Sequence, residues 1–271
     1  MNKALLNRWG TGLAWGVVLL VVLNIGQVAL YCVIAAFMLI SMYEILNALA
    51  LAGFTVFKWV HYACAVLMIG VIPFGEPRWD IAALLLCVAV ALISVVFTKG
   101  KPDASNMLSA ILPTMYPFIP FVALLLLASY RSEHAMLMLW LLCFSSIFSD
   151  VFAFLIGSKW GKHKLIPHVS PNKSVEGALG GLIGAIALTL VVGCYGYLFN
   201  HTTLPFAHIV AIGVVGSVAT QVGDLVASYI KRFCGVKDFG SFFPGHGGVL
   251  DRVDGLLINA VAVYAYCLIF L

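Results

Sequence analysis

Charged side chains are scarce in this sequence of 271 residues. Asp, Glu, Lys and Arg together make up 10% of it, whereas hydrophobic residues make up 63%. A soluble domain typically carries about 25% charged residues, so this chain has too few charges to cover a surface that faces water. The composition excludes a soluble globular protein and predicts an all-α, polytopic integral membrane protein.

Cysteine occurs without the spacing that a metal site or a disulfide framework needs. The seven cysteines are spread almost one to each hydrophobic segment, and none forms a CxxC pair. Isolated cysteines of this kind usually serve as small apolar helix residues. We expect neither disulfide bonds nor zinc. The sequence also lacks an internal repeat, a low-complexity tract and a soluble domain, and we expect no nucleic-acid partner.

Long apolar runs are abundant, and each run of about twenty residues is a candidate membrane span. The runs predict nine transmembrane helices, near residues 10–26, 28–48, 55–73, 79–98, 106–129, 134–157, 176–198, 205–229 and 253–271. The first run follows a basic start but lacks a small-residue cleavage site. We therefore expect it to be retained as a helix rather than removed as a signal peptide.

The distribution of Lys and Arg predicts the orientation, because cytoplasmic loops of membrane proteins are enriched in both residues. With nine spans and a cytoplasmic N-terminus, every Lys and Arg except Arg78 and Arg131 falls on the inside. The C-terminus is then outside. We expect the protein in the cytoplasmic membrane of a bacterium, with its polar loops facing the cytoplasm.

The two parts of the chain differ in polarity. Residues 1–140 hold apolar helices and short loops, and we interpret them as a scaffold that could also admit lipid. Their charged residues lie near predicted helix ends, where we expect solvated or interfacial positions: Glu44, Glu76, Arg78 and Asp80. The prolines of MYPFIPF, residues 115–121, predict a kink packed against neighbouring helices. Residues 141–271 form the predicted catalytic region, with cytoplasmic loops at 158–175 and 230–252.

Polar residues begin to gather at the end of the sixth predicted span. Asp150 lies inside that span, where a lone carboxylate is costly unless it is paired, protonated or bound to a metal. Lys173 and Ser174 follow in the loop, just before the predicted start of the next helix at Glu176. The lysines at 159, 162 and 164 fit either a binding site or an ordinary cytoplasmic flank that holds anionic lipid head groups. The sequence leaves both interpretations of these lysines open.

Glycines open the seventh predicted helix. Gly177, Gly180, Gly181 and Gly184 form two overlapping small-xxx-small patterns. Small residues at this spacing let two helix backbones approach closely. The pattern predicts tight helix packing and no chemistry.

A second polar stretch runs from Gln221 to Asp254, between the last two predicted spans. Its helical part carries Asp224, Ser228, Lys231 and Arg232 about one helical turn apart, so these residues stack on one face. That face leads from a carboxylate at membrane depth to cations at the cytoplasmic surface.

The turn between the last two spans is rich in glycine. Three glycines surround His246 within residues 245–248, and glycine lets backbone N–H groups approach an anion closely, as in phosphate-binding nests. Asp251 and Asp254 follow at i and i+3, with Arg252 between them, so the two carboxylates face the same way at the start of the last helix.

Converging carboxylates without His or Cys partners predict a site of oxygen ligands. Such a site suits Mg²⁺ bound to polyphosphate better than zinc. Nearby cations can neutralise phosphate charge and stabilise displacement at phosphorus. The sequence therefore favours nucleotide and lipid-phosphate chemistry at the membrane surface. An ion-coupled transporter stays open as an alternative, although the acids gather at one loop rather than along a path across the membrane.

The stretch from Ser228 to Asp254 resembles the signature of the phosphatidate cytidylyltransferases, also called CDP-diacylglycerol synthases. It reads Ser228-Tyr229-Ile230-Lys231-Arg232, then Lys237-Asp238, then FPGHGGVLDRVD from Phe243 to Asp254. A second block of the family is similar to residues 150–177 at Asp150, Gly157, Gly161-Lys162, Leu165, Ser170-Pro171, Lys173 and Glu176-Gly177. Length and the expected number of spans are similar too, so the resemblance covers the whole chain.

This resemblance implies that the phosphate of phosphatidic acid attacks the α-phosphorus of CTP, giving CDP-diacylglycerol and pyrophosphate. Mg²⁺ is the implied cofactor, with a second cation left open. Asp224, Asp251 and Asp254 are the implied metal ligands, and Asp224, Asp251 and Lys231 the implied catalytic residues. The implied substrate-binding residues are Ser228, Arg232, Lys237, Asp238, His246, Gly247, Gly248, Arg252, Asp150, Lys173 and Ser174. A CTP-dependent lipid kinase, or transfer to another lipid phosphate, is the alternative within the superfamily, and a homodimer is left open.

The chain departs from the family pattern in the earlier loop. Where many members have Lys-Lys-Thr-Trp-Glu-Gly, it has Asn-Lys-Ser-Val-Glu-Gly at 172–177, and Phe154 replaces a tyrosine. The positions from 224 to 254 are unaltered. The resemblance therefore specifies the chemistry of the later stretch more firmly than the substrate contacts of the 150–177 loop.

Overall fold

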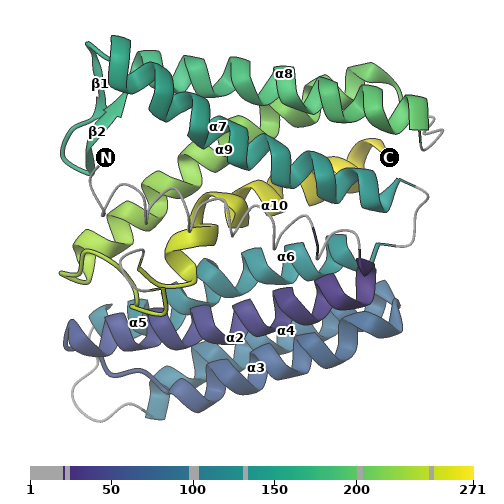
Figure 1. Cartoon of the computed structure of the whole chain (residues 1–271). Coiled ribbons are helices and arrows are strands. Elements are labelled where there is room, and N and C mark those ends of the chain that lie inside the picture. The colour runs from purple at the N-terminus through teal and green to yellow at the C-terminus, as the bar shows by residue number, and fades with distance from the viewer. Residues whose placement is uncertain (1–20, 22–24, 98–103, 131–133, 200–203, 244–246) are drawn as a thin grey trace.

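The computed structural model describes residues 21, 25–97, 104–130, 134–199, 204–243 and 247–271. They form long helices joined by short loops (Figure 1): α2 (Gln27–Leu51), α3 (Lys58–Val71), α4 (Pro77–Ser94), α5 (Ala104–Pro113), α6 (Ile119–Ala128), α7 (Ala135–Trp160), α8 (Val175–Phe199), α9 (Phe206–Phe233) and α10 (Leu250–Phe270). The short turns η1 (Ile72–Phe74) and η2 (Val95–Phe97) follow α3 and α4, and the π-helical turn η3 (Thr114–Phe118) joins α5 to α6.

Seven helices within the described residues are long and apolar enough to cross a membrane: 27–51, 77–97, 107–128, 135–160, 175–199, 206–233 and 250–270. The apolar helix at 58–74 is shorter. A helix satisfies all its backbone hydrogen bonds within one segment, which is what a bilayer requires of apolar runs. The structure confirms a helical, polytopic membrane protein. The predicted span at 10–26 lies outside the described residues, so the total of nine spans stays a prediction.

The helices pack in layers, and α9 and α10 lie in the middle (Figure 1). α7 and α8 cover this central pair on one side. On the other side, α10 contacts α6 and α2, beyond which lie α3, α4 and α5. The polar turn between α9 and α10 is therefore held between the two parts of the chain.

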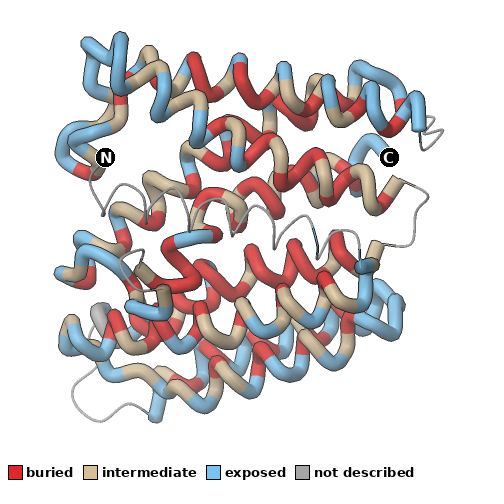
Figure 2. Tube along the Cα trace, viewed as in Figure 1, coloured by how far each residue is buried: buried red, intermediate tan, exposed pale blue. Residues whose placement is uncertain are grey.

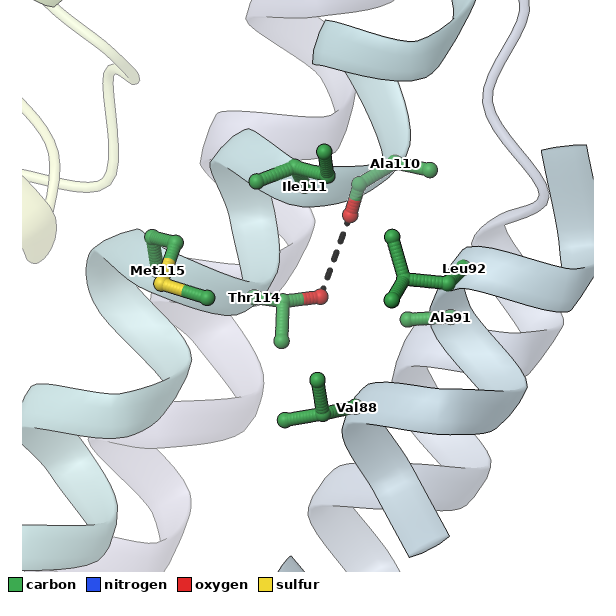
Figure 3. Close-up of a pocket in the computed structure, with 7 residues that line it drawn as sticks. All are labelled: Val88, Ala91, Leu92, Ala110, Ile111, Thr114 and Met115. Atoms are coloured by element: carbon green, nitrogen blue, oxygen red, sulfur yellow. Dashed lines mark hydrogen bonds between the residues drawn. The ribbon is translucent and has the colours of Figure 1, made fainter. Parts of the chain in front are cut away.

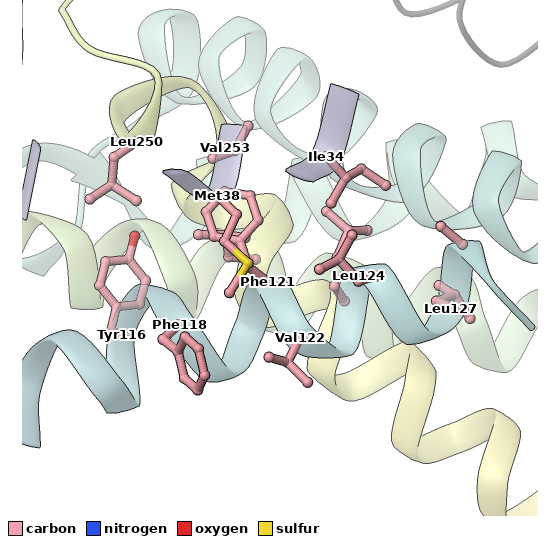
Figure 4. Packing of buried hydrophobic residues seen from close by; sticks show 14 of the residues in the cluster. Ile34, Met38, Tyr116, Phe118, Phe121, Val122, Leu124, Leu127, Leu250 and Val253 are labelled. Carbon is pink, nitrogen blue, oxygen red and sulfur yellow. The ribbon is translucent and has the colours of Figure 1, made fainter. Parts of the chain in front are cut away.

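A continuous apolar core joins the first helices to the last one. Met38 of α2, Phe121 of α6 and Leu257 of α10 are among its fully buried members, and Figure 4 shows the packing around the first two. Exposed positions follow the outer faces of the helices (Figure 2). Many of the exposed residues are large and apolar, among them Ile81 and Leu179. Lipid tails are as apolar as these side chains, so the core is stabilised by close packing more than by removal from water.

The glycines at the start of α8 bring it against α7. A Cβ atom at Gly177 would lie 2.8 Å from the carbonyl oxygen of Ala153, and one at Gly181 would lie 2.6 Å from that of Ser149. Both approaches are too close for any larger residue without movement of the backbone. The predicted tight packing is confirmed.

A small β-hairpin connects α7 to α8. Its strands β1 (Lys164–Ile166) and β2 (Ser170–Ser174) pair antiparallel, with Lys164 opposite Ser174. This two-stranded sheet is a local departure from the expected all-α fold. It gives the loop that carries Lys173 a fixed backbone.

The polar loops lie at one end of the bundle. The hairpin, the residues between α2 and α3, and the turn after α9 share that end, whereas the turn between α3 and α4 and the C-terminus lie at the other (Figure 1). This grouping agrees with the topology expected from the sequence. Which end faces the cytoplasm stays a prediction.

An apolar crevice of about 200 Å³ lies between α4 and the α5–η3 segment (Figure 3). It is lined by Val88, Ala91, Leu92, Ala110, Ile111, Thr114 and Met115. The hydroxyl of Thr114 donates to the carbonyl of Ala110 at 3.1 Å. Because this hydroxyl is bonded within the helix, the surface that lines the crevice is apolar. The crevice suits hydrocarbon and lies apart from the polar turn.

The charged residues of the first helices correct one expectation. Glu76 and Arg78 are solvated as predicted, and pair at 3.5 Å with exposed side chains. Glu44 and Asp80 are instead buried, so the prediction of solvated or interfacial positions is wrong for both. Asp80 lies in the first turn of α4, where the helix dipole favours an acid, and Glu44 meets backbone N–H groups of the polar turn.

Candidate active site

Ion pairs join the end of α9 to the start of α10. The Nζ of Lys231 lies 2.9 Å from Oδ1 of Asp251 and 3.7 Å from Oδ2 of Asp254. The side chain of Lys231 is 14% exposed and that of Asp251 is 2% exposed. Because one amine pairs with both carboxylates, the prediction that Asp251 and Asp254 face the same way is confirmed.

The turn between α9 and α10 folds around Asp251. Its Oδ2 accepts the N–H of Phe239 at 2.8 Å and the N–H of Gly248 at 3.0 Å. Gly247 has φ +82°, and a Cβ atom there would lie 2.9 Å from the same oxygen. Glycine is required at 247 both for this backbone conformation and for the close approach of the carboxylate.

A second ion pair joins the β-hairpin to α9. The Nζ of Lys173, on β2, lies 2.8 Å from Oδ2 of Asp224, on α9, and the two side chains are 28% and 22% exposed. These residues are far apart in the sequence but meet at the same end of the bundle. The structure thereby brings two of the predicted site residues from separate loops into one site.

Further acidic groups lie beside this pair. The carboxyl groups of Asp224 and Asp254 interact electrostatically where α9 packs against α10. α9 and α10 approach closely here, since a Cβ atom at Gly255 would lie 2.9 Å from Oδ1 of Asp224. Asp150 on α7 is exposed, and its carboxyl group interacts electrostatically with Asp224 and Lys173. Carboxylates from three helices therefore share one electrostatic site with two lysines.

The remaining predicted substrate-binding residues lie on α9, in the turn that follows it and at the start of α10. Ser228 is half-buried on α9, one turn before Arg232, and the other charged members lie on exposed positions: Arg232, Lys237, Asp238 and Arg252. Exposed cations at this end of the bundle are free to reorient toward a phosphate. His246 lies outside the described residues.

Ser174 has a structural contact that the sequence did not predict. It is buried, and its Oγ accepts the N–H of Gly177 at 3.1 Å. A serine in this position satisfies one of the unpaired N–H groups at a helix start. The hydroxyl predicted to touch substrate thus supports the start of α8 and the loop that carries Lys173.

Backbone N–H groups at the end of the glycine turn bond to the protein's own carboxylates. The N–H of Gly248 donates to Asp251, and those of Val249 and Leu250 donate to the two oxygens of Glu44 at 2.9 and 2.8 Å. The N–H of Gly248 is therefore bonded within the protein, and a contact of Gly248 with substrate stays a prediction. A helix N-terminus attracts any anion, and Glu44 on α2 supplies one permanently.

The kink at residues 115–121 also faces the site. Tyr116 interrupts the helix with φ −148° and ψ 119°, inside the π-helical turn η3. Its hydroxyl is buried without a hydrogen-bond partner among the described residues, in the field of Asp224, Asp251 and Asp254. The predicted kink is confirmed. The two prolines predicted where the kink lies. They did not predict that the kink would bring the side chain of Tyr116 close to the carboxylates.

Cys234, directly after α9, offers no nucleophile to this site. Burial raises the pKa of its thiol, so the thiol stays protonated at neutral pH. All seven cysteines are free. The thiol of Cys234 is therefore not a candidate nucleophile for group transfer at this site.

The acidic side chains of the site match what Mg²⁺ needs when it binds together with a substrate. In the described part of the chain, no three His, Cys, Asp or Glu side chains are already grouped around a common metal position. Mg²⁺ usually takes one or two carboxylates together with substrate phosphates, and the neighbouring Asp224 and Asp254 match that requirement. Asp251 accepts three hydrogen bonds, which leaves about one of the four lone-pair positions of its carboxylate open. The residues present fit Mg²⁺ that arrives with a polyphosphate.

Comparisons with known proteins agree with this chemistry. A family model described as the cytidylyltransferase family matches residues 6–270. A phosphatidate cytidylyltransferase of Mycobacterium bovis is 31% identical over 93% of this chain and 85% of its own length. A protein of the same name from Thermotoga maritima is 34% identical over 70% of each chain. One from Helicobacter pylori is 42% identical over 58% of this chain and 55% of its own.

Proposed function

Because the chain belongs to the cytidylyltransferase family, we propose that it transfers the cytidylyl group of CTP to phosphatidic acid. The products are CDP-diacylglycerol and pyrophosphate. The names of its relatives support this substrate pair, and the many apolar helices support a substrate that resides in the membrane.

One observation carries the proposal further than the family name. Lys173 reaches from the β-hairpin to Asp224, so two polar loops close over one group of carboxylates and cations at the end of the bundle. A polar site at that end can meet both a soluble nucleotide and the head group of a lipid. A path for ions would need polar groups across the membrane instead.

In the proposed reaction, an oxygen of the phosphatidate phosphate forms a bond to the α-phosphorus of CTP. The bond from that phosphorus to the oxygen bridging to the β-phosphorus breaks, and pyrophosphate leaves with the electron pair. Negative charge increases on the leaving oxygen and remains on the phosphates throughout. Positioned cations stabilise such a displacement more strongly in a site with little water.

We assign these cationic roles to side chains of both loops. Lys231, fixed by Asp251 and Asp254, faces the centre of the site, and Lys173 faces it from the hairpin. Arg232, Lys237 and Arg252 are exposed around it and would hold the outer phosphates. Asp224 and Asp254 would hold Mg²⁺, with the open position of Asp251 beside them. When bound, Mg²⁺ would neutralise phosphate charge.

The finer topology is part of the proposal. We propose nine spans, an N-terminus and an active site on the cytoplasmic side, and a first part of the chain, 1–140, that acts as scaffold and route for lipid. The grouping of Lys58, the hairpin lysines and Lys231 at one end supports this orientation.

The reaction is tested with the full-length protein purified in detergent and supplied with CTP, phosphatidic acid and Mg²⁺. We expect CDP-diacylglycerol and pyrophosphate in equal amounts. Asp224→Asn removes the charge that faces Lys173 and the proposed metal, and should lower turnover at least about 100-fold. Arg78→Gln, an exposed cation at the other end of the bundle, is the control and should retain turnover.

The outcomes separate the alternatives. Product from another lipid phosphate but not from phosphatidic acid would move the function to that acceptor. Transfer of the γ-phosphate of CTP to a lipid alcohol would indicate a lipid kinase. Full turnover of the Asp224→Asn protein would overturn the role of this carboxylate while leaving the overall reaction standing.

A further inference from the structure

Glu44 is the acidic residue of the first helices that reaches the active-site turn. Glu44 lies on α2 and is 4% exposed. Its two carboxylate oxygens accept the N–H groups of Val249 and Leu250 at 2.9 and 2.8 Å. The structure gives Glu44 no Lys, Arg or His partner among the described residues. Its charge is therefore balanced by the N-terminus of α10, where free N–H groups and the helix dipole favour an anion.

The turn is shaped to admit this carboxylate. A Cβ atom at Gly240 or at Gly248 would collide with the carboxyl group of Glu44. Both positions thus need glycine because an acid from a distant helix approaches the backbone there. This accounts for glycine at position 248, whose N–H group is bonded to Asp251.

The residues that donate hydrogen bonds to Glu44 are next to Asp251 in the sequence. Val249 and Leu250 directly precede Asp251, and the preceding Gly248 donates its N–H to the Oδ2 of Asp251. The other oxygen of Asp251 pairs with Lys231. A shift of the backbone at 249–250 would therefore move Asp251 and, through it, the amine of Lys231.

We propose that Glu44 is a positioning residue for the transferase reaction: its carboxylate fixes the start of α10 and so sets the place of Asp251 and Lys231. Glu44 touches neither of these side chains through a hydrogen bond of its own and acts through the backbone between them. The inference rests on the proposed cytidylyltransferase function for its kinetic consequence. Its structural consequence, a turn held by the charge of Glu44, can be measured independently.

The main variant is Glu44→Gln, which keeps the shape of the side chain and removes its charge. One of the two oxygens becomes an NH₂ group that faces a backbone N–H, so one hydrogen bond is replaced by a contact between two donors. We expect kcat to fall about 10–100-fold, as for a small misplacement of catalytic groups, while KM for CTP changes less than about threefold. Amide hydrogen exchange at residues 248–252 should become at least about tenfold faster.

Two further variants distinguish positioning from space filling. Glu44→Asp keeps the charge but is shorter, and should retain more activity than Glu44→Gln. If Glu44 only filled space, the isosteric Gln would be the better replacement. Ser41→Ala is the matched control: Ser41 is buried one turn earlier on α2, its hydroxyl has no partner among the described residues, and its loss should leave exchange and kcat unchanged.

Kinetics and hydrogen exchange decide the proposal separately. Wild-type kcat and wild-type exchange at 248–252 in the Glu44→Gln protein would overturn the positioning role. If that variant cannot be purified folded, Glu44→Asp carries the test, and a wild-type kcat with unchanged exchange there would overturn it equally. Absence of transferase activity in the unaltered protein would instead refute the proposed function, and the exchange data would still decide whether Glu44 holds the turn.

Discussion

Two lysine–aspartate contacts meet in this site, and they differ in burial and in what they connect. Lys231 and Asp251 lie on either side of one turn, with side chains 14% and 2% exposed. Lys173 lies on the hairpin and Asp224 on α9, with side chains 28% and 22% exposed. Their Nζ–O distances are nearly equal, 2.9 and 2.8 Å. Distance alone would therefore give the two contacts the same role.

Their surroundings assign them different roles. Asp251 also accepts two backbone N–H groups, so its pair with Lys231 is built into the turn and cannot open without exposing bonded groups. Asp224 has Lys173 as its cationic partner, and that lysine sits on a hairpin outside the helix bundle. The first contact is a fixed framework, and in the proposed reaction the second would open to admit phosphate between the hairpin and α9.

Removing the buried acid should have the largest effect. Asp251→Ala leaves the amine of Lys231 without its nearest partner and leaves the N–H groups of Phe239 and Gly248 unpaired. Breaking a buried pair in this way typically costs about 3–5 kcal/mol of folding free energy. We expect loss of turnover together with a clearly lower melting temperature in detergent. Asp238→Ala, an exposed acid in the same turn, should leave the melting temperature unchanged.

An Asp251→Ala protein with the melting temperature of the unaltered protein would contradict the comparison. The buried pair would then contribute to chemistry without supporting the fold. Turnover in that variant would further show that Lys231 acts without Asp251, with Asp254 as its remaining partner.

Replacing the lysine of the exposed pair should give the opposite balance of effects. Lys173→Met removes a contact in a quarter-exposed position, where ion pairs contribute about 0–1 kcal/mol to stability, so the melting temperature should hardly change. Turnover should fall more than about tenfold, because a cation facing the phosphates is lost. Lys159→Gln, an exposed lysine at the end of α7, is the control and should affect neither quantity.

If Lys173→Met lowers the melting temperature as much as Asp251→Ala does, both pairs are structural and the hairpin is part of the framework. If it changes neither stability nor turnover, the hairpin does not complete the site. Either result would remove the distinction between the two contacts.

Several of these features could be predicted from the sequence, for local physical reasons. Asp251 and Asp254 face the same way because helix geometry fixes residues three apart. The glycines at 177 and 181 indicated the tight approach of α8 because their spacing matches one helix face. The family resemblance implied that Lys173 and Asp224 share a site, and in the structure the two side chains form an ion pair.

Other features depend on contacts that a sequence pattern does not contain. Glu44 is a single acid on an apolar helix, and its partners lie more than two hundred residues later (205 for Val249). Ser174 has the same local sequence whether its hydroxyl faces substrate or the start of α8. The orphaned hydroxyl of Tyr116 follows from the kink between α5 and α6, whose direction the two prolines do not specify. These roles become visible once the helices are packed.

The smallest effect is expected from the support of the hairpin. Glu176, at the start of α8, accepts the N–H groups of Lys162 and His163 and contacts the His163 ring at 2.6 Å, where that side chain is 80% exposed. Glu176→Gln weakens these bonds but keeps an acceptor, so stability should change by less than about 1 kcal/mol. Turnover should fall only a few-fold, because β2 and Lys173 become less well placed.

A double-mutant cycle decides whether Glu176 acts through Lys173. Non-additive effects arise when two residues share one contact or one structural element, and distant independent residues give effects that add. If Glu176 serves to hold the hairpin in place, Glu176→Gln should have no further effect on turnover in the Lys173→Met protein. Additive effects would mean that Glu176 affects turnover independently of Lys173. The hairpin would then influence the described site through a contact other than the Lys173–Asp224 pair.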